Sequence, residues 1–258
     1  MSDRDPFILK LETFAALDEG DRDLLRDRCR RIVAMRAKEE IVQEGADPQV
    51  VHLVLSGFAC RYKILADGSR QIVAFLLPGD FCDLHVFILD EHDHNIATLT
   101  DCRLALLSRE DVTALCGRPR VARALWWSTL VDQAILREWL LNIGRRSAEE
   151  RVAHLLCELL ERLRNVGLVS ADNSFKLPVT QGELADTLGL TVVHVNRMIR
   201  NLRDMDLIAV SGRQIMVPDV EGLKRFCGFR ANYLHLERDR SRPDDALAES
   251  EAFAMRVD

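Results

Sequence analysis

Long apolar segments are absent from this sequence. No stretch approaches the roughly 20 consecutive apolar residues that a membrane-spanning helix needs. Residues 1–7 are largely polar and contain no apolar core of a secretion signal. We therefore expect a soluble protein of the cytoplasm that has no membrane partner.

Paired cysteines are also absent. The chain has seven cysteines but no Cys-x-x-Cys pair, which excludes a zinc ribbon and a disulfide framework. Only Cys29 precedes Cys60, so an N-terminal cysteine cluster for an iron–sulfur centre is missing. Dispersed thiols suit a reducing cytoplasm. The sequence also lacks a nucleophile elbow, a phosphate loop and a dinucleotide fingerprint, so we expect no enzyme.

The chain also lacks a surplus of positive charge. The 258 residues carry 35 Lys and Arg against 41 Asp and Glu, a net charge of −6. A protein that coats nucleic acid through its overall charge is thereby excluded, and any DNA binding must come from one local element. The length is sufficient for two domains.

Residues 179–217 carry the most specific pattern in the chain. Thr180 and Glu183 form a capping box at the start of a helix, and Gly189 is suited to end it. Thr191 is a second N-cap residue and begins a helix over residues 192–204. Two capped helices joined through one glycine are typical of a helix-turn-helix.

The second helix of this pair separates into two faces. An apolar stripe at helical spacing would pack on the first helix: Val195, Met198, Ile199 and Leu202. The other side carries Val193, Asn196, Arg197 and Arg200, with His194 on the flank. Arg197 is suited to donate to guanine O6 and N7, and Val193 to meet a thymine methyl. An ordinary amphipathic helix with a charged outer face is the alternative.

A short hairpin follows the two helices. Residues 207–210 and 214–217 have the composition of two strands around Gly212, which predicts a wing. Arg213 at its turn could contact a DNA phosphate. The same is expected of five residues on the two helices: Thr180, Gln181, Thr191, His194 and Arg200. We therefore predict a winged helix-turn-helix that binds double-stranded DNA.

Glycines divide the N-terminal half into short strands. Gly45, Gly57, Gly68 and Gly79 occur every 11 or 12 residues and separate apolar runs. Further strands are expected at residues 96–99 and 103–107, after a first short helix that begins near Asp18. This spacing indicates an all-β sandwich or barrel.

Residues 118–144 read as one long helix that is apolar on nearly every side. Pro119 suits its first turn, and the apolar residues include Leu125, Trp126, Leu130 and Trp139. A helix of this kind must be buried on more than one side. One side can pack on its own domain and the other on a second copy of the chain. A core helix of a monomer is the alternative.

The segment LPVTQGELADTLGLTVVHVNRMIRNLRDMDLI resembles the DNA-binding domain of the Crp–Fnr superfamily, the catabolite activator and fumarate–nitrate type regulators. The resemblance extends over about residues 10–228. It implies an α+β fold with a cyclic-nucleotide-binding-like, jelly-roll-like β-roll sensor domain at residues 1–117 and a dimerisation helix at 118–144. A winged helix-turn-helix at 145–228 and a polar tail at 229–258 complete the predicted domains.

The resemblance also implies a function. The chain would be a dimeric transcription regulator that binds a palindromic operator and responds to an effector at the β-roll, with RNA polymerase as a further candidate partner. Family members read DNA with an arginine at the position of Arg197. They commonly carry Glu, Ser or Gly at the positions of Val193 and Asn196, so their operator sequence does not transfer to this chain.

The effector is predicted not to be cAMP. A cyclic-nucleotide pocket of the family uses a Gly-Glu pair for the ribose and an Arg-Ser pair for the phosphate. No arginine lies between Gly79 and Thr100, and several carboxylates there would repel a phosphate. The candidate effector residues are Asp80, Phe81, Cys82, Asp83, Leu84, His94 and Asn95.

Other interpretations of residues 82–94 stay open. His85, His92 and His94, with Asp83, Asp90 and Asp93, could bind a metal or haem, or could simply form a polar surface loop. Cys82 is either a redox-sensing thiol or an inert core residue. A cupin-like metalloenzyme, with His92 and His94 as the first two ligands, is the least favoured alternative. The cofactor, if there is one, is not identified by the sequence.

Overall fold

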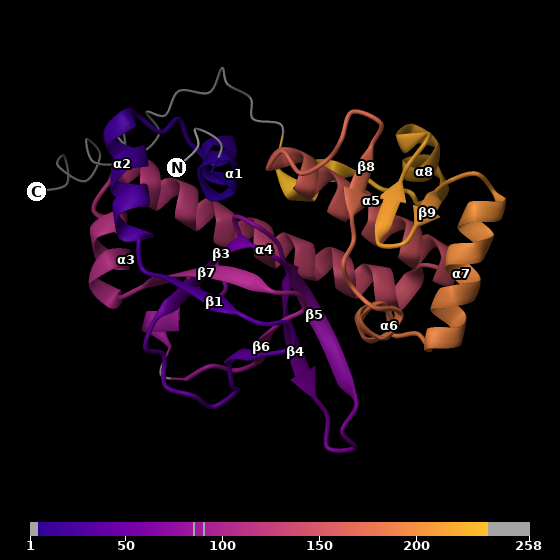
Figure 1. The fold of residues 1–258 in the computed structure, drawn as a ribbon, viewed down its shortest axis with the longest axis horizontal. Coiled ribbons are helices and arrows are strands. Elements are labelled where there is room, and N and C mark those ends of the chain that lie inside the picture. Colours follow the sequence, from indigo (N-terminus) through magenta and orange to yellow (C-terminus); the bar gives the residue numbers. More distant parts are fainter. Residues whose placement is uncertain (1–4, 85, 90, 237–258) are drawn as a thin grey trace, which may run out of the picture.

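A computed structural model describes residues 5–84, 86–89 and 91–236. A β-rich N-terminal domain, a long helix and a mainly helical C-terminal domain follow one another along the chain (Figure 1). The predicted α+β class and the order of its parts are confirmed. None of the helices within these residues is long and apolar enough to cross a membrane.

The N-terminal domain is built from two antiparallel sheets. One sheet has the strand order β1 (Ile32–Met35), β7 (Cys102–Leu107), β3 (Val51–Ser56). The other has the order β2 (Glu40–Val42), β6 (Asn95–Thr98), β4 (Ala59–Ile64), β5 (Arg70–Leu76). Strands β3 to β7 lie where the glycine spacing predicts them. The short strands β1 and β2 are additional. Of their seven residues only Val42 is buried, so neither strand has a buried face that an apolar pattern could mark.

Gly57 shows why a glycine separates β3 from β4. Its φ is +89°, and a Cβ at this position would lie 2.3 Å from the carbonyl oxygen of Asp101. A side chain would therefore collide with the turn between β6 and β7. The glycine lets the turns at this end of the β-roll pack closely.

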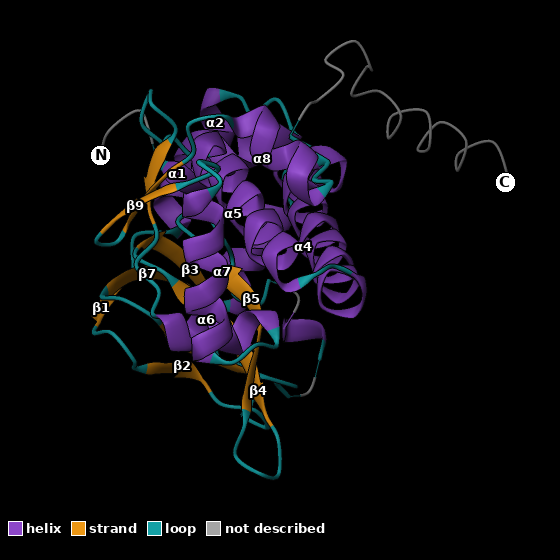
Figure 2. Ribbon diagram, turned by 90° about the vertical axis from the view of Figure 1, so that its right-hand side faces the viewer, coloured by secondary structure: helices purple, strands orange, loops and turns teal. Residues whose placement is uncertain are grey.

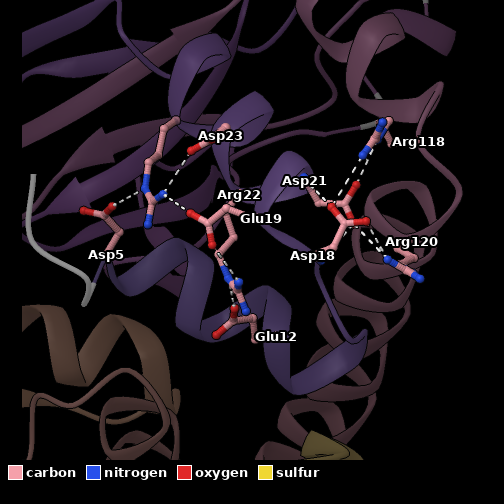
Figure 3. Close-up of polar contacts among 10 residues, drawn as sticks. Asp5, Glu12, Asp18, Glu19, Asp21, Arg22, Asp23, Arg118 and Arg120 are labelled. Atoms are coloured by element: carbon pink, nitrogen blue, oxygen red, sulfur yellow. Dashed lines mark hydrogen bonds and ion pairs between the residues drawn. The ribbon is translucent and has the colours of Figure 1, made fainter.

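Three helices and a short 3-10 turn complete this domain: α1 (Pro6–Phe14), α2 (Glu19–Arg28), α3 (Arg109–Cys116) and η1 (Val86–Ile88). The helix expected near Asp18 is α2, and Asp18 forms a capping box with Asp21. It is the second helix, however, because α1 precedes it. Figure 3 shows Asp18 and Asp21 facing Arg118 and Arg120, with Arg118 Nε 2.9 Å from Asp21 Oδ1. These ion pairs hold α2 against the start of the long helix.

The long helix α4 (Pro119–Arg145) packs one side against the β-roll and leaves the other open. Val121, Leu125 and Trp139 are buried on the packed side. On the open side Trp126 is 65%, Leu130 61% and Leu140 73% exposed. The single chain therefore leaves an apolar seam of the helix uncovered.

The C-terminal domain begins with α5 (Ala148–Asn165) after a capping box of Ser147 and Glu150. Helix α8 (Val220–Cys227) is capped by Asp219. The turn η2 (Ala231–Leu234) lies within the predicted polar tail, and its Tyr233 is buried with its hydroxyl donating to Glu158 Oε2 at 2.9 Å. Residues 237–258 lie outside the described part of the chain.

A buried histidine lies at the junction of α4 and α5. His154 packs against the rings of Phe229 and Tyr233, and neither of its ring nitrogens has a hydrogen-bond partner within the described residues. Its Nε2 lies 3.3 Å from Glu138 Oε1, which also pairs with Arg146 at 2.7 Å. Burial, and secondarily the nearby Arg146 charge, lowers the pKa of His154 to about 3. The imidazole is therefore neutral in the folded chain.

We expect His154 to make the protein acid-sensitive. The pKa of His154 is about 6.5 in the unfolded chain and about 3 in the folded chain. Its contribution to the free energy of unfolding is therefore fully present above pH 6.5 and is lost as the pH falls. Between pH 7 and pH 5 the wild type should lose about 1–2 kcal/mol more unfolding free energy than His154→Leu. Urea unfolding at fixed protein concentration measures this difference. Parallel pH profiles of the two proteins would contradict it.

Candidate nucleic-acid interface and sensor-domain cleft

The helix-turn-helix is formed by α6 (Gln181–Leu188) and α7 (Val192–Asp204). Thr180 Oγ1 accepts from the backbone N–H of Glu183, and Glu183 Oε2 accepts from the backbone N–H of Thr180 at 2.6 Å. Gly189 ends α6 in the left-handed region with φ +63°. Thr191 caps α7 by accepting from the backbone N–H of His194 at 3.3 Å. Local hydrogen bonds thus fix the angle at which α7 leaves α6.

Helix α7 presents a continuous exposed face. The stripe of Val195, Met198 and Leu202 is buried against the rest of the domain. The predicted DNA contacts on the other side are all exposed: Val193, His194, Asn196, Arg197 and Arg200. Val193 is 76% exposed. The Asn196 amide donates to Val192 O at 3.1 Å, whereas Arg197 and Arg200 form no hydrogen bond or ion pair with any described residue. Both guanidinium groups are available for an external acceptor.

The wing is a three-stranded sheet. Strands β9 (Ala209–Ser211) and β10 (Gln214–Met216) flank Gly212, and β8 (Ser174–Lys176) pairs with the outer side of β10. The sequence predicts the first two strands but not β8. Arg213 is exposed at the turn of the wing. Figure 2, which looks onto the end of the molecule where α7 lies, shows the wing strand β9 along one edge.

The predicted DNA contacts fall into two groups. Thr191 and the exposed residues of α7 lie on one helix face. Thr180 and Arg213 instead line a cleft between the C-terminal domain and the β-roll, and the exposed Gln181 adjoins Thr180. The structure thus divides the predicted contacts between a helix face and the edge of this cleft.

Helix α6 connects this interface to the β-roll. Arg70 Nε of β5 donates to Asp186 Oδ2 at 2.8 Å, and Gln71 Nε2 donates to Thr187 O at 3.2 Å. The β4–β5 hairpin therefore bears directly on the helix that precedes α7.

A second cavity lies between the β-roll, α4 and α5. It has a volume of about 280 Å³ and is lined by β4, β5, the segment around His94, α4 and Arg162 of α5. Arg61 of β4 is its central charged group. Arg61 lies 3.6 Å from Asp83 Oδ1 and 3.5 Å from Asp132 Oδ2 of α4, and its Nε donates to Cys82 O at 2.9 Å. The arginine links the β-roll to the long helix.

Two of the seven candidate effector residues, Asp83 and His94, line this cavity. Asp80 points elsewhere and pairs with Lys10 of α1 at 2.5 Å and Arg162 of α5 at 2.8 Å. Burial acts to raise the pKa of Asp80, but these two cations hold it below its ordinary value. Asp80 thus links α1 to α5 through its two ion pairs.

The other four candidates also lie outside the cavity lining. Phe81 and Cys82 are buried, Leu84 is half-buried, and Asn95 accepts from the backbone N–H of Glu44 at 3.0 Å. Burial raises the pKa of the Cys82 thiol, which disfavours the reactive thiolate. Cys82 is placed as a core residue.

Two of the histidines considered for a metal converge on one carboxylate. His92 Nδ1 lies 3.1 Å from Asp83 Oδ2, and His94 Nε2 lies 3.2 Å from Asp83 Oδ1. Among the described residues no group of three or more His, Cys, Asp or Glu side chains has an arrangement suited to a metal ion. His85 and Asp90 lie outside the described residues. Asp83 is therefore a partner for two imidazoles and for Arg61.

The charged residues that organise the cavity were not identified from the sequence. Arg61, Asp132 and Arg162 come from β4, α4 and α5, far from the 78–97 stretch on which the sequence prediction relies. Arg61 did give one indication of its role, because it is a charged residue of β4 between Cys60 and Tyr62, which are both buried.

Two protein-family models match the chain. A Crp-like helix-turn-helix domain matches residues 150–226, and a cyclic nucleotide-binding domain matches residues 32–118. A probable transcriptional activator of Rhizobium leguminosarum is 31% identical over 213 residues, which cover 81% of this chain and 86% of that protein. The nitrogen fixation regulation protein FixK of Bradyrhizobium diazoefficiens is 35% identical over 185 residues, 70% of this chain and 75% of the relative.

A comparison with solved structures gives the same result. The structure of FixK2 from Bradyrhizobium japonicum matches with a TM-score of 0.67 and 32% identity, over 75% of this chain and 95% of that one.

Proposed function

The chain belongs to the Crp–Fnr superfamily of DNA-binding transcription regulators, and from this premise we propose that it binds a two-fold symmetric operator as a homodimer. The single observation that carries the proposal is the exposed face of α7 with its two unpaired arginines. A recognition helix in the major groove supplies base contacts of this kind. The family consists of transcription regulators, and the proposed role requires no catalysis.

The apolar seam of α4 supports the dimer. Trp126, Leu130 and Leu140 are each more than 60% exposed along one helix. A contiguous apolar surface of this kind marks an interaction site. A second copy of the same helix is the simplest partner, because a two-fold contact buries the same seam on both chains. The two copies of α7 would then address two half-sites about one helical turn apart.

A selection from random double-stranded DNA tests this function. We expect the purified protein to enrich one inverted repeat with half-sites about 10 base pairs apart, centre to centre. Arg197→Ala should enrich no sequence. Recovery of unrelated sequences by the wild type would reject sequence-specific binding.

The charged residues of the sensor-domain cavity argue against a cyclic nucleotide as the effector. Arg61 already has two carboxylate partners, and Arg162 pairs with Asp80 and Glu158. Lys63 pairs with Glu44. No lysine or arginine that lines this cavity is therefore unpaired among the described residues, so a cyclic phosphate would meet no available cation. We infer that the Asp83–Arg61–Asp132 contact takes over the link to α4 that a ligand would otherwise make.

Asp132→Asn tests this link. The substitution removes one of the two counter-charges of Arg61 and loosens α4 from the β-roll. We expect operator affinity to fall about tenfold, within the usual 1–3 kcal/mol of coupling between sites. Millimolar cAMP should leave the wild-type affinity unchanged in the same fluorescence-anisotropy titration. A rise in operator affinity with cAMP, or wild-type operator affinity of Asp132→Asn, would contradict the inference. Gln133→Ala, at the neighbouring position, is the control.

The remaining partners follow from the proposed role. A cytoplasmic location belongs to the same proposal, because the regulator must reach its operator DNA. The relatives include proteins named as transcriptional activators, and activation requires contact with the transcription machinery. We therefore propose RNA polymerase as a further partner.

A further inference from the structure

Two cysteines of the C-terminal domain lie in direct contact. Cys157 belongs to α5 and Cys227 is the last residue of α8, and their Sγ atoms are 4.0 Å apart. Figures 1 and 2 both place α8 beside α5, although the two cysteines are 70 residues apart in the sequence. The fold thus brings together two thiols that no sequence motif pairs.

The hydrogen bonds of this pair give the two thiols different roles. The Cys227 thiol donates to the backbone carbonyl oxygen of Leu223 at 3.2 Å, one turn earlier in α8. The Cys227 sulfur can therefore accept from the Cys157 thiol. This contact lowers the pKa of Cys227, against the opposing effect of burial, and raises the pKa of Cys157. Cys227 is the thiol of the pair that more readily becomes a thiolate.

Cys227 differs in this respect from the other six cysteines, whose pKa values are all raised. It also lies nearer to solvent than its partner. The side chain of Cys227 is 4% exposed and is followed by the exposed Gly228, whereas Cys157 is fully buried. The thiolate is the nucleophile in thiol oxidation, so a small oxidant would react with Cys227 first.

We propose that Cys157 and Cys227 form a reversible disulfide when the protein meets a peroxide. The distance between their sulfur atoms has to shorten by about 2 Å, because a disulfide bond is about 2.05 Å long. Cys227 ends α8, so this movement falls on the end of a helix and not on its interior. Disulfides of a reducing compartment are usually transient and respond to redox conditions. The inference does not depend on DNA binding.

The reaction takes place in two steps. The Cys227 thiolate attacks one oxygen of the peroxide, the O–O bond breaks, and the sulfur becomes a sulfenic acid while the other oxygen leaves as hydroxide. The Cys157 sulfur then attacks the Cys227 sulfur, the S–O bond breaks and the S–S bond forms. The second hydroxide leaves with the proton of Cys157 as water. Two thiols are oxidised and one hydrogen peroxide is reduced to water, and a dithiol reverses the change.

The disulfide would join two helices that adjoin the DNA-binding elements. Helix α5 contacts α7 through Asn201, whose Nδ2 donates to Glu149 Oε1 at 3.2 Å. Helix α8 directly follows the wing strand β10. The helix that contacts α7 and the helix that follows the wing would then be held together by a covalent bond.

The test uses the full-length protein and an equimolar amount of hydrogen peroxide. We expect the number of free thiols, counted after unfolding, to fall by two from the seven of the reduced chain. The mass of the chain should fall by that of two hydrogen atoms, and proteolysis should yield a peptide pair linked through Cys157 and Cys227. Dithiothreitol should restore all seven thiols.

Single substitutions separate the two steps. Cys227→Ala should neither lose a further thiol nor gain oxygen, because Cys157 alone is buried and has a raised pKa. Cys157→Ser keeps a hydroxyl that can donate to Cys227 but removes the second sulfur, so oxygen should accumulate on Cys227. Circular dichroism checks that both variants are folded. The control is Cys116→Ala, which removes the one exposed cysteine and should form the disulfide as the wild type does.

Two results would overturn the inference and leave the proposed function untouched. Recovery of Cys157 and Cys227 as free thiols from the peroxide-treated wild type would show that the contact is only a packed pair of core residues. A disulfide that includes Cys116, or a loss of thiols that persists in Cys227→Ala, would assign the oxidation to another site.

Discussion

Replacing Arg197 by alanine should abolish specific operator binding. The guanidinium lies on the exposed face of α7 and has no partner within the described residues. A bidentate arginine–guanine contact contributes about 1–3 kcal/mol of discrimination, and a dimer makes it twice. The expected loss is therefore about 2–6 kcal/mol, or at least about thirtyfold in specific affinity. Fluorescence anisotropy with the selected operator measures it.

Arg203→Ala is the matched control for this experiment. Arg203 is also exposed on α7 but lies in the last turn of the helix, away from the N-terminal residues that enter a groove. We expect a small loss that affects specific and random duplexes alike. An unchanged footprint of Arg197→Ala would remove Arg197 from base recognition.

Leu140→Glu should convert the dimer into monomers. Leu140 is 73% exposed in the single chain and lies in the apolar seam of α4. The two-fold contact would bury a carboxylate from each chain in an apolar interface, at a cost of several kcal/mol. We expect the dimer dissociation constant to rise about a hundredfold or more, measured by sedimentation equilibrium. Operator affinity should fall with it, because a monomer holds only one half-site.

Met205→Glu controls for the new charge. Met205 is 45% exposed just after α7 and lies outside the seam of α4. This variant should remain dimeric. A dimeric Leu140→Glu protein would show that the exposed seam of α4 is not the interface.

The sequence predicts the helix-turn-helix almost residue by residue, because its signals are local. The capping box of Thr180 and Glu183, the left-handed Gly189 and the N-cap Thr191 each act within four residues. The apolar spacing of α7 then fixes which side is exposed. Helix α1 also has a local pattern, because Phe7, Leu11 and Phe14 are apolar, lie at helical spacing and are buried. The sequence analysis nevertheless does not predict this helix.

The sensor domain was predicted less completely, because its contacts are distant in sequence. Arg61 meets Asp132 of α4, and Asp80 meets Lys10 and Arg162, so the partners come from different elements. Periodicity assigns a strand or a helix but does not show which charged residues pair across the fold. The sequence therefore placed Asp80 among the effector residues, whereas the structure pairs it with α1 and α5.

Native mass spectrometry of the protein with the selected operator duplex would show whether the chain binds DNA as a two-fold dimer. We expect one complex that contains two chains and one duplex, and free protein that is a dimer. One chain per duplex, or free protein that is monomeric, would contradict the dimer formed through α4 and with it the two-fold binding of DNA.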